Sequence, residues 1–338
     1  MLAALAAAVL CIAAFAALAS MASLDVGKDS ARMTVREEYI EGNGRDKVVA
    51  IPIRGAIFDE SEEGIFGVRR SMVERVVRQL RQAAADENVR AVVLCVDSPG
   101  GGVTASDIIW NEVRKLKQAG GGKKVVVHMG DLCASGGYYI SAPADWIIAS
   151  PTTITGSIGV IMMHLDVSEL MERKLGIKEQ AIKSGPMKDM LSPMRPMSDE
   201  EKRILQELID SMYSRFVRIV AEGRKGRGNI PADIEGAITA VRKIADGRIY
   251  TADQAEKNGM VDGIGYFEDA VAKAKELAGL TEATVVRYGE RKGIFDLLSG
   301  DAASLVSVNA GLRLDVGDLS RRLTPRLEYR WVPAPLGN

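Results

Sequence analysis

Hydrophobic and polar positions follow two alternating patterns from Lys47 to His128. Short runs centred on consecutive apolar residues occur at Lys47–Gly55, Ala91–Val96 and Lys123–His128. Between them, over Ser71–Ala85 and Ser106–Gln118, apolar residues recur every three to four positions. The runs predict buried strands, and the periodicity predicts amphipathic helices. Apolar strands separated by helices indicate an α/β fold whose parallel sheet is covered on both faces.

The same patterning continues to about Leu280 and then weakens. A long helix is predicted to begin at Ser198, and a last one covers Phe267–Leu277. We therefore expect one folded domain over residues 47–280, preceded by a polar linker over residues 25–46 and followed by a C-terminal extension over residues 281–338.

Residues 1–24 contain no charged side chain and consist mainly of Ala, Leu, Val, Ile, Phe and Met. As a helix rising about 1.5 Å per residue, the segment would be about 36 Å long, enough to cross a hydrocarbon core of about 30 Å. A cleaved secretory signal is the alternative, because Ala17–Ala19 and Ser20–Ala22 resemble small-residue cleavage sites. We favour a transmembrane anchor, since the apolar run is longer than the core of a usual signal peptide.

Charge, cysteine and histidine content exclude several classes of function. Lys and Arg number 44 against 45 Asp and Glu, so no nucleic-acid partner is expected. Cys11, Cys95 and Cys133 lie in apolar surroundings without CxxC spacing, which argues against a disulfide framework and a zinc site. The only two histidines, His128 and His164, are expected to be structural. We expect neither a metal nor a cofactor.

The stretch from Val125 to Val160 carries the clearest chemical signal. Three β-branched residues at its start lead into the small residues 133–137, and residues 138–142 have helical character. Such a strand-to-helix turn can present Ser135 at a helix N-terminus, where outward-pointing amides stabilise negative charge. This arrangement suits a nucleophilic serine beside an oxyanion hole. A helix-capping serine followed by flexible glycines is the alternative.

Two other features favour a site at this edge of the sheet. The turn Asp97-Ser-Pro-Gly-Gly-Gly follows the second strand, and its glycines allow an extended peptide to approach the backbone and add to it as a strand. Like Ser135, this turn follows the carboxyl end of a parallel strand, where α/β sheets form sites. Lys188 has Pro186, Met187 and Met190 as neighbours, so it could be desolvated and act as a general base. A surface lysine whose stem covers apolar neighbours is the alternative.

Five short motifs connect these features. They are Asp-Ser-Pro-Gly-Gly-Gly at 97–102, Ala-Ser-Gly-Gly-Tyr-Tyr at 134–139, Gly-Ser-Ile-Gly-Val at 156–160, Ser-Gly-Pro-Met-Lys-Asp at 184–189 and Ala-Asp-Gly-Arg-Ile-Tyr at 245–250. In this order and spacing, from about Lys47 to Ala278, the chain resembles the signal peptide peptidase A family, in its short, single-copy form. The resemblance implies a ClpP/crotonase-like fold of repeated β-β-α units. It also implies a membrane-bound serine endopeptidase that degrades released signal peptides and assembles into homo-oligomeric rings or domes.

Carried onto this sequence, the resemblance makes Ser135 the nucleophile and Lys188 the general base of a Ser/Lys dyad. Ser157 would hydrogen-bond the lysine and orient it, and the backbone amides of Gly101 and Gly136 would form the oxyanion hole. We expect a single-pass membrane protein whose catalytic domain lies on the extracytoplasmic side. Two alternatives stay open, a crotonase-type acyl-CoA enzyme and a catalytically silent scaffold of the same fold.

Overall fold

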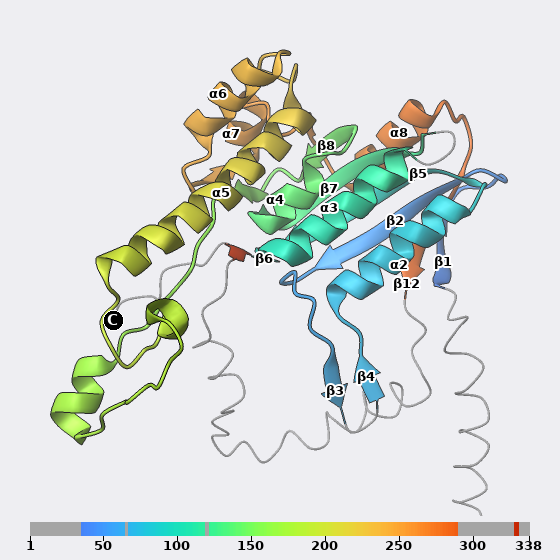
Figure 1. The fold of residues 1–338 in the computed structure, drawn as a ribbon. Coiled ribbons are helices and arrows are strands. Elements are labelled where there is room, and N and C mark those ends of the chain that lie inside the picture. The colour runs from blue at the N-terminus through green and yellow to red at the C-terminus, as the bar shows by residue number, and fades with distance from the viewer. Residues whose placement is uncertain (1–34, 65–66, 119–121, 290–327, 331–338) are drawn as a thin grey trace, which may run out of the picture. The chain divides into compact units, whose positions relative to one another are not determined.

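The computed structural model describes residues 35–64, 67–118, 122–289 and 328–330. Within them the strands of the main sheet are β1 (Arg36–Glu41), β2 (Lys47–Arg54), β5 (Val89–Ser98), β7 (Lys124–Ala134), β8 (Trp146–Ala149), β9 (Ile154–Gly156), β10 (Ile249–Thr251), β11 (Gly263–Ile264) and β12 (Thr284–Gly289). The strand order is β1-β12-β2-β5-β7-β8-β11, and β9 pairs with both β7 and β10 (Figure 1). The pairs from β12 to β11 are parallel, and β9–β10 is antiparallel. The predicted α/β class with a mostly parallel sheet is confirmed.

The remaining elements are short strands and helices. The strands β3 (Glu62–Gly64) and β4 (Gly67–Arg69) form a hairpin, and β6 (Gly100–Gly102) pairs with β13 (Glu328–Arg330). The helices are α2 (Met72–Ala85), α3 (Val103–Gln118), α4 (Gly136–Ser141), α5 (Asp199–Arg224), α6 (Ile234–Ile244), α7 (Ala252–Lys257) and α8 (Phe267–Ala278), with a π-helical turn η1 (Leu170–Lys174) and a 3-10 turn η2 (Pro186–Asp189).

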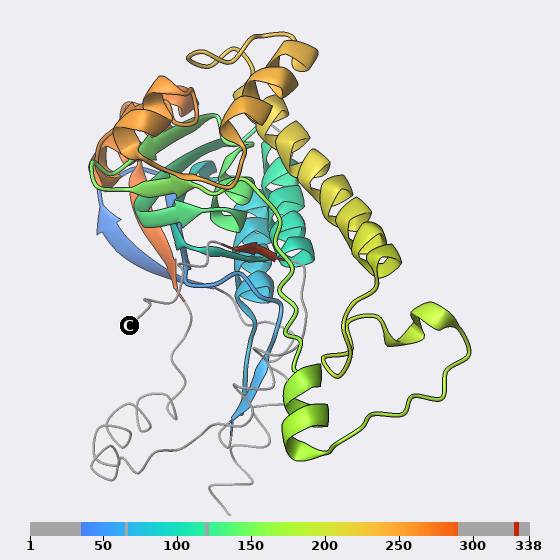
Figure 2. The ribbon, with the colours of Figure 1, turned by 90° about the vertical axis from the view of Figure 1, so that its left-hand side faces the viewer.

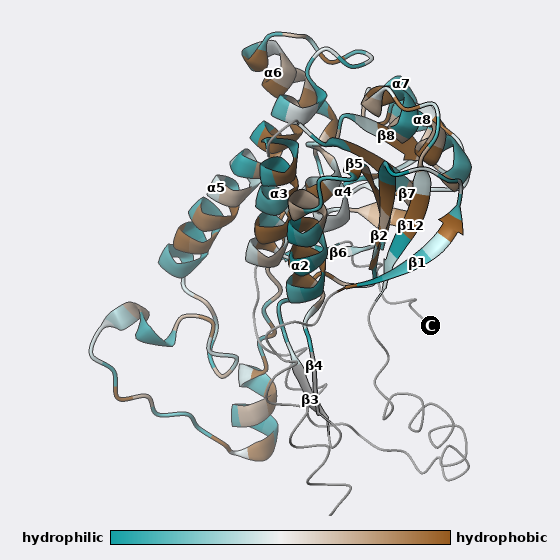
Figure 3. Ribbon diagram, turned by 90° about the vertical axis from the view of Figure 1, so that its right-hand side faces the viewer, coloured by the Kyte–Doolittle hydropathy of each residue, from teal (hydrophilic) through white to brown (hydrophobic). Residues whose placement is uncertain are grey.

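The central strands are buried on both faces because helices cover both. Alternate residues of β2, β5 and β7, such as Val48, Val93 and Val126, pack with the small residues of α8 in one core cluster. Since successive strand residues point to opposite faces, the intervening positions face the layer of α2 and α3. Figure 3 shows the hydrophobic strands between these two helical layers. This double covering explains why the middle of each strand is a run of consecutive apolar residues.

The helices begin where capping residues or strand ends allow. Ser71 caps α2 by accepting a hydrogen bond from the Glu74 amide at 3.0 Å, which confirms the predicted helix from this region. The predicted helix at Ser106–Gln118 begins earlier, at Val103, because the glycine strand β6 ends at Gly102. Strand β7 continues past His128 to Ala134, because its last residues pair with β9.

Helix α5 is the longest helix in the described part of the chain, and its two ends lie in different environments. Its C-terminal part is buried around Phe216, Val220 and Arg224, and Arg224 donates to both carboxylate oxygens of Asp262 at 2.9 and 2.7 Å. A Cβ atom on Gly223 would lie 2.0 Å from the carbonyl oxygen of Ala142, so α5 crosses close against the end of α4. The N-terminal part of α5 is largely exposed.

Between β9 and α5 the chain leaves the sheet. Residues 162–198, named the arm below, include η1 and η2 and extend away from the sheet and from α4 in both views (Figures 1 and 2). Large apolar side chains on the arm are exposed, among them Leu165, Leu175 and Ile182. The helical segment around η1 covers residues 168–175 and is π-helical over Leu170–Lys174.

The predicted anchor at residues 1–24 and most of the extension at residues 281–338 lie outside the described residues. Within the described ranges, no helix combines the length and apolar character needed to span a bilayer. The described residues from Glu37 onward belong to a single contact unit. Its sheet takes in β1 and β12, which lie on either side of the predicted range 47–280.

Candidate active site

Ser135 lies at a strained turn between β7 and α4. Its φ is 52° and its ψ is −114°, a backbone conformation that residues other than glycine rarely adopt. The Ser135 amide donates to the Gly156 carbonyl at 2.7 Å, and its carbonyl accepts from the Tyr139 amide at 2.9 Å. Because β7, β9 and α4 fix both sides of the turn, the strain is retained. The side chain of Ser135 makes no hydrogen bond with any residue that the structure describes.

The glycines around Ser135 are required by close backbone contacts. A Cβ atom on Gly136 would lie 2.5 Å from the Ser106 hydroxyl, and one on Gly101 would lie 2.1 Å from the Ile57 carbonyl oxygen. A Cβ atom on Gly100, whose φ is +92°, would lie 2.5 Å from the Gly136 amide nitrogen. The turn after β5 and the start of α4 are therefore in direct contact, so the structure brings the two predicted oxyanion-hole segments together.

Strand β13 lies along this glycine turn. It pairs antiparallel with β6 and places Tyr329 opposite Gly101, while Glu328 and Ile161 exchange backbone hydrogen bonds of 3.1 Å on its other side. The Tyr329 carbonyl oxygen would be 2.0 Å from a Cβ atom on Gly100 and 3.0 Å from one on Gly136. An extended backbone with its carbonyl packed against Gly100 and Gly136 thus occupies the edge where the sequence predicts that a peptide strand binds.

The side chain of Tyr329 fills a pocket formed by residues of α4 and α5. Its ring stacks on Tyr139 of α4 with centroids 4.9 Å apart and contacts Phe216 of α5 at 4.7 Å. Its hydroxyl donates to the Met212 carbonyl at 3.0 Å, and the residue is 0% exposed. The pocket is therefore lined by aromatic rings and suits a large apolar side chain. Sequence analysis missed β13, because three residues are too few to show a strand pattern.

Ser157 lies next to Ser135 through the backbone of β9. It follows Gly156, whose carbonyl accepts the Ser135 amide, and its own φ is 50°. The Ser157 amide donates to the Arg248 carbonyl at 2.7 Å, so the motif at 245–250 holds this serine in place. Ser135, Ser157, Gly101 and Gly136 are thus gathered at one edge of the sheet.

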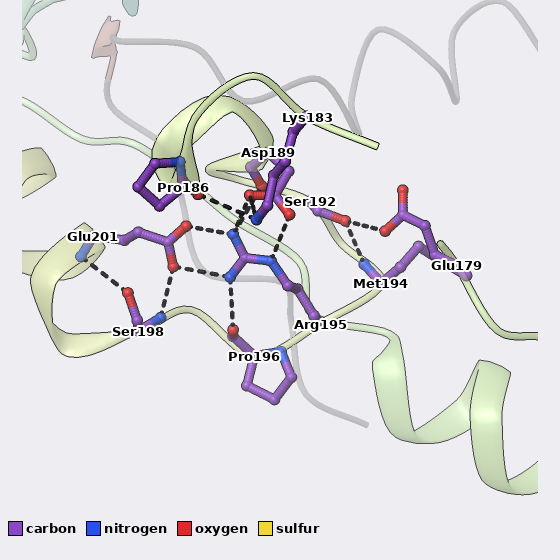
Figure 4. Close-up of polar contacts among 10 residues, drawn as sticks. All are labelled: Glu179, Lys183, Pro186, Asp189, Ser192, Met194, Arg195, Pro196, Ser198 and Glu201. Carbon is purple, nitrogen blue, oxygen red and sulfur yellow. Dashed lines mark hydrogen bonds and ion pairs between the residues drawn. The ribbon is translucent and has the colours of Figure 1, made fainter. Parts of the chain in front are cut away.

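Lys188 is not part of this cluster within one chain. It lies in η2 on the arm, and its side chain is exposed. Among the described residues, no hydrogen bond or ion pair joins Lys188 to Ser135 or Ser157. Figure 4 shows that charged residues surround the turn that carries it, with Arg195 between Asp189 and Glu201.

The histidines and cysteines have other roles in the described part of the chain. His128 lies 3.2 Å from the Ser150 hydroxyl, burial lowers the pKa of its ring, and neither it nor His164 hydrogen-bonds Ser135. Burial raises the pKa of the Cys133 thiol to about 12, so this thiol stays protonated at neutral pH. Cys11 lies outside the described residues. Within those ranges, no cluster of three or more His, Cys, Asp or Glu residues could hold a metal ion.

Comparison with known proteins agrees with this geometry. The profile of peptidase family S49 matches residues 117–281, which include Ser135, Ser157 and Lys188. A protein of Enterococcus faecium that carries the name signal peptide peptidase SppA is 37% identical over 303 residues, covering 89% of this chain and 84% of the relative. Protease 4 of Salmonella typhi is 35% identical over 86% of this chain and 42% of its own length. The chloroplastic serine protease SPPA of Arabidopsis thaliana is 29% identical over 80% of this chain and 39% of its own length. The chain therefore belongs to peptidase family S49 and is a serine endopeptidase.

Proposed function

We propose that this endopeptidase uses Ser135 as its nucleophile and Lys188 as its general base, on a ClpP/crotonase-like fold. We propose further that it is anchored in the membrane by residues 1–24, and that its substrates are released signal peptides and other extended, apolar peptides. The observation that carries the proposal is strand β13 against β6, with the Tyr329 carbonyl packed against Gly100 and Gly136. A substrate backbone bound in the same way would present its scissile carbonyl next to Ser135.

In the proposed reaction, neutral Lys188 takes the proton of the Ser135 hydroxyl as the Ser135 oxygen bonds to the scissile carbonyl carbon. The amides of Gly101 and Gly136 stabilise the resulting oxyanion, while Ser157 orients the lysine. Lysine returns its proton to the leaving amine when the peptide bond breaks. It then takes a proton from a water molecule as the water oxygen bonds to the acyl carbon, and it returns that proton to the Ser135 oxygen when the ester bond breaks and the second product leaves.

The aromatic pocket supports a preference for apolar substrates. In a peptide that adds to β6 as an antiparallel strand, the residue opposite Gly101 would place its side chain where Tyr329 now lies. Backbone hydrogen bonds would supply affinity, and this pocket would supply selectivity. A folded globular protein should be a poor substrate, because it cannot offer an extended strand.

The position of Lys188 supports a dyad assembled from two copies of the chain. The lysine is exposed on an arm that extends away from its own Ser135, and apolar side chains of that arm, such as Leu175 and Ile182, are exposed as well. Both exposures would be explained if the arm packs against a neighbouring protomer and delivers Lys188 to that protomer's serine. We therefore propose a homo-oligomer on the extracytoplasmic side of the membrane.

Mixing two inactive variants tests the dyad and the assembly together. Ser135→Ala and Lys188→Ala should each be inactive on an apolar reporter peptide. If the dyad joins two protomers, mixed oligomers of these variants should regain activity, because some sites pair an intact serine with an intact lysine. The double variant mixed with wild type is the control for dilution. If the Lys188→Ala variant is active on its own, the dyad is refuted. If the mixed oligomers are inactive, a dyad formed between two protomers is refuted.

A crotonase-type reaction and a silent scaffold predict different outcomes. Lys188→Arg should be as inactive as Lys188→Ala, because arginine does not lose its proton. His128→Ala and His164→Ala should remain active. Hydrolysis of a coenzyme A thioester without peptide cleavage would favour the crotonase alternative, and the absence of both activities in purified wild type would favour the scaffold.

The anchor is tested by extraction of membranes. Full-length protein should stay with the membrane after carbonate washing, and protein that lacks residues 1–24 should be soluble and active. A mature protein that begins near Ser20 or Ser23 and is released by carbonate would refute the anchor.

A further inference from the structure

The turn that carries Lys188 also carries a carboxylate that could compete for it. Asp189 follows the lysine directly in η2, and the Asp189 carbonyl accepts the Ser192 amide at 3.0 Å, which closes the turn. A lysine that serves as a general base must lose its proton, and an adjacent carboxylate that paired with its ammonium would oppose this loss. Asp189 must therefore be prevented from pairing with Lys188.

Arg195 engages this carboxylate. Its Nε donates to Asp189 Oδ2 at 3.1 Å and its Nη2 donates to Oδ1 at 2.8 Å, a bidentate pair (Figure 4). Nη2 also donates to the Asp189 carbonyl at 3.1 Å, and Lys183 donates to Oδ1 at 2.7 Å. Both carboxylate oxygens of Asp189 are thereby occupied, and the Lys188 ammonium has no hydrogen-bond or ion-pair partner among the described residues.

The same guanidinium fastens the turn to α5. Arg195 Nη1 donates to Glu201 Oε2 at 2.9 Å, and Nη2 donates to Glu201 Oε1. Glu201 is 2% exposed, and its Oε2 also accepts the Ser198 amide at 2.7 Å in the capping box that starts α5. Arg195 thus bridges the lysine turn and the first turn of the longest helix, and a planar guanidinium is the one side chain that can pair with two carboxylates in this way.

The other charged groups around the turn are few. Lys183 is bound to Asp189 and to the Pro186 carbonyl, and Glu179 accepts from the Ser192 hydroxyl at 2.6 Å. Lys183 and Arg195 are thus the cations that pair with Asp189 and Glu201. Loss of Arg195 would remove one of these two cations and would free Asp189 Oδ2, which accepts only from Arg195 among the described residues.

We propose that Arg195 is a positioning residue for Lys188, which fixes the lysine turn to the start of α5 and keeps Asp189 from pairing with the lysine. The proposal rests on the proposed function of Lys188 as the general base. It gives Arg195 two separable effects, one on the location of the lysine and one on its charge.

The test compares pH–rate profiles of full-length variants on one apolar reporter peptide. Arg195→Gln should lower kcat by about tenfold or more with little change in KM, since Arg195 does not touch the substrate. The rising limb of its profile should move up by about one pH unit, because a freed Asp189 carboxylate stabilises the protonated lysine. Adding Asp189→Asn should remove the pH shift and leave kcat low. Arg203→Gln is the matched control, because Arg203 forms an exposed pair with Glu207 on the same helix, and it should behave as wild type.

Separate outcomes distinguish this proposal from the dyad. Arg195→Gln with wild-type kcat and profile would overturn it. The proposal would also be overturned if Arg195→Gln lowered kcat without moving the rising limb of the pH–rate profile. The same holds if the limb stayed shifted in the double variant Arg195→Gln/Asp189→Asn, since either result would leave Arg195 only a structural role. Partial recovery of kcat by Arg195→Lys or by added guanidinium would support it. If Lys188→Ala itself is active, the dyad fails, whatever Arg195 does.

Discussion

The two regions that the proposed dyad would bring together are built in opposite ways. Ser135 is 1% exposed and is fixed by backbone contacts among β7, β9 and α4, where several glycines admit no side chain. Lys188 is exposed on the arm, and its turn is fixed by ion pairs around Arg195. Packing in the first region leaves no freedom, whereas charges in the second can be rearranged by solvent, salt and pH. The serine is therefore preformed, and the lysine is adjustable.

The largest expected effect comes from breaking the charged contact inside the folded core. Arg224→Met leaves the buried Asp262 carboxylate without its bidentate partner and with only the longer ion pair to Arg227, and we expect a loss of about 3 kcal/mol in the free energy of unfolding. The matched change on the arm, Arg195→Met, should leave the midpoint of global unfolding unchanged. Denaturant titration of both variants measures the contrast, and equal midpoints would show that the two regions do not differ in this way.

A smaller but decisive effect is expected at the glycine contact. Gly100→Ala should lower activity by about a hundredfold or more, because its Cβ would collide with the Tyr329 carbonyl and the Gly136 amide. Gly279→Ala is the control, since Gly279 also has positive φ but no atom within 4 Å of the added Cβ. It should lower stability by about 1 kcal/mol and leave kcat/KM unchanged. A fully active Gly100→Ala enzyme would exclude this edge from the site.

Replacing Tyr329 should change substrate affinity by a few-fold. If substrates bind where β13 lies, Tyr329→Ala weakens a competing strand by removing its contacts with Tyr139 and Phe216. We therefore expect KM for a short apolar peptide to fall about threefold to tenfold, with kcat nearly unchanged. A rise in KM would indicate that β13 helps to form the binding site.

The smallest effect is expected in acid. Hydrogen bonds from Arg195 and Lys183 hold the pKa of Asp189 below its usual range, and those from Arg195 and Ser198 lower the pKa of Glu201 to about 2. Because these values are depressed in the folded protein, the stabilisation is complete above the ordinary carboxyl range and is lost as pH falls through the lowered values.

The arm should consequently resist pepsin at about pH 4 and be cleaved near residues 183–197 at about pH 2. Arg195→Gln, already without its ion pairs, should be cleaved at both values. Equal cleavage of the wild-type arm at both pH values would contradict the prediction.

Sequence patterns predicted the parts of the molecule that local chemistry determines. Apolar runs located β2, β5 and β7, and small residues at 133–137 located the turn at Ser135, because burial and backbone sterics act on nearby residues. The pairing of β13 with β6 was not predictable, since it joins segments more than two hundred residues apart through three residues without a pattern of their own.

The role of Arg195 was also not predictable from the sequence. Its partners Asp189 and Glu201 are each six residues away, a spacing that no helix brings to one face, so only the folded arm reveals the contact. The predicted dyad residues Ser135 and Lys188 remain a prediction, because one chain does not place them together.

The close crossing at Gly223 has a mechanical consequence. Helix α5 contains 26 residues, so it is about 39 Å long, and its buried end rests on the Ala142 carbonyl while its other end holds the arm through Glu201. A rotation of α5 by about 5° about the contact at Gly223 would displace its N-terminal end by about 3 Å. A methyl group added at Gly223 would therefore shift the position of the arm, although it touches neither Ser135 nor Lys188.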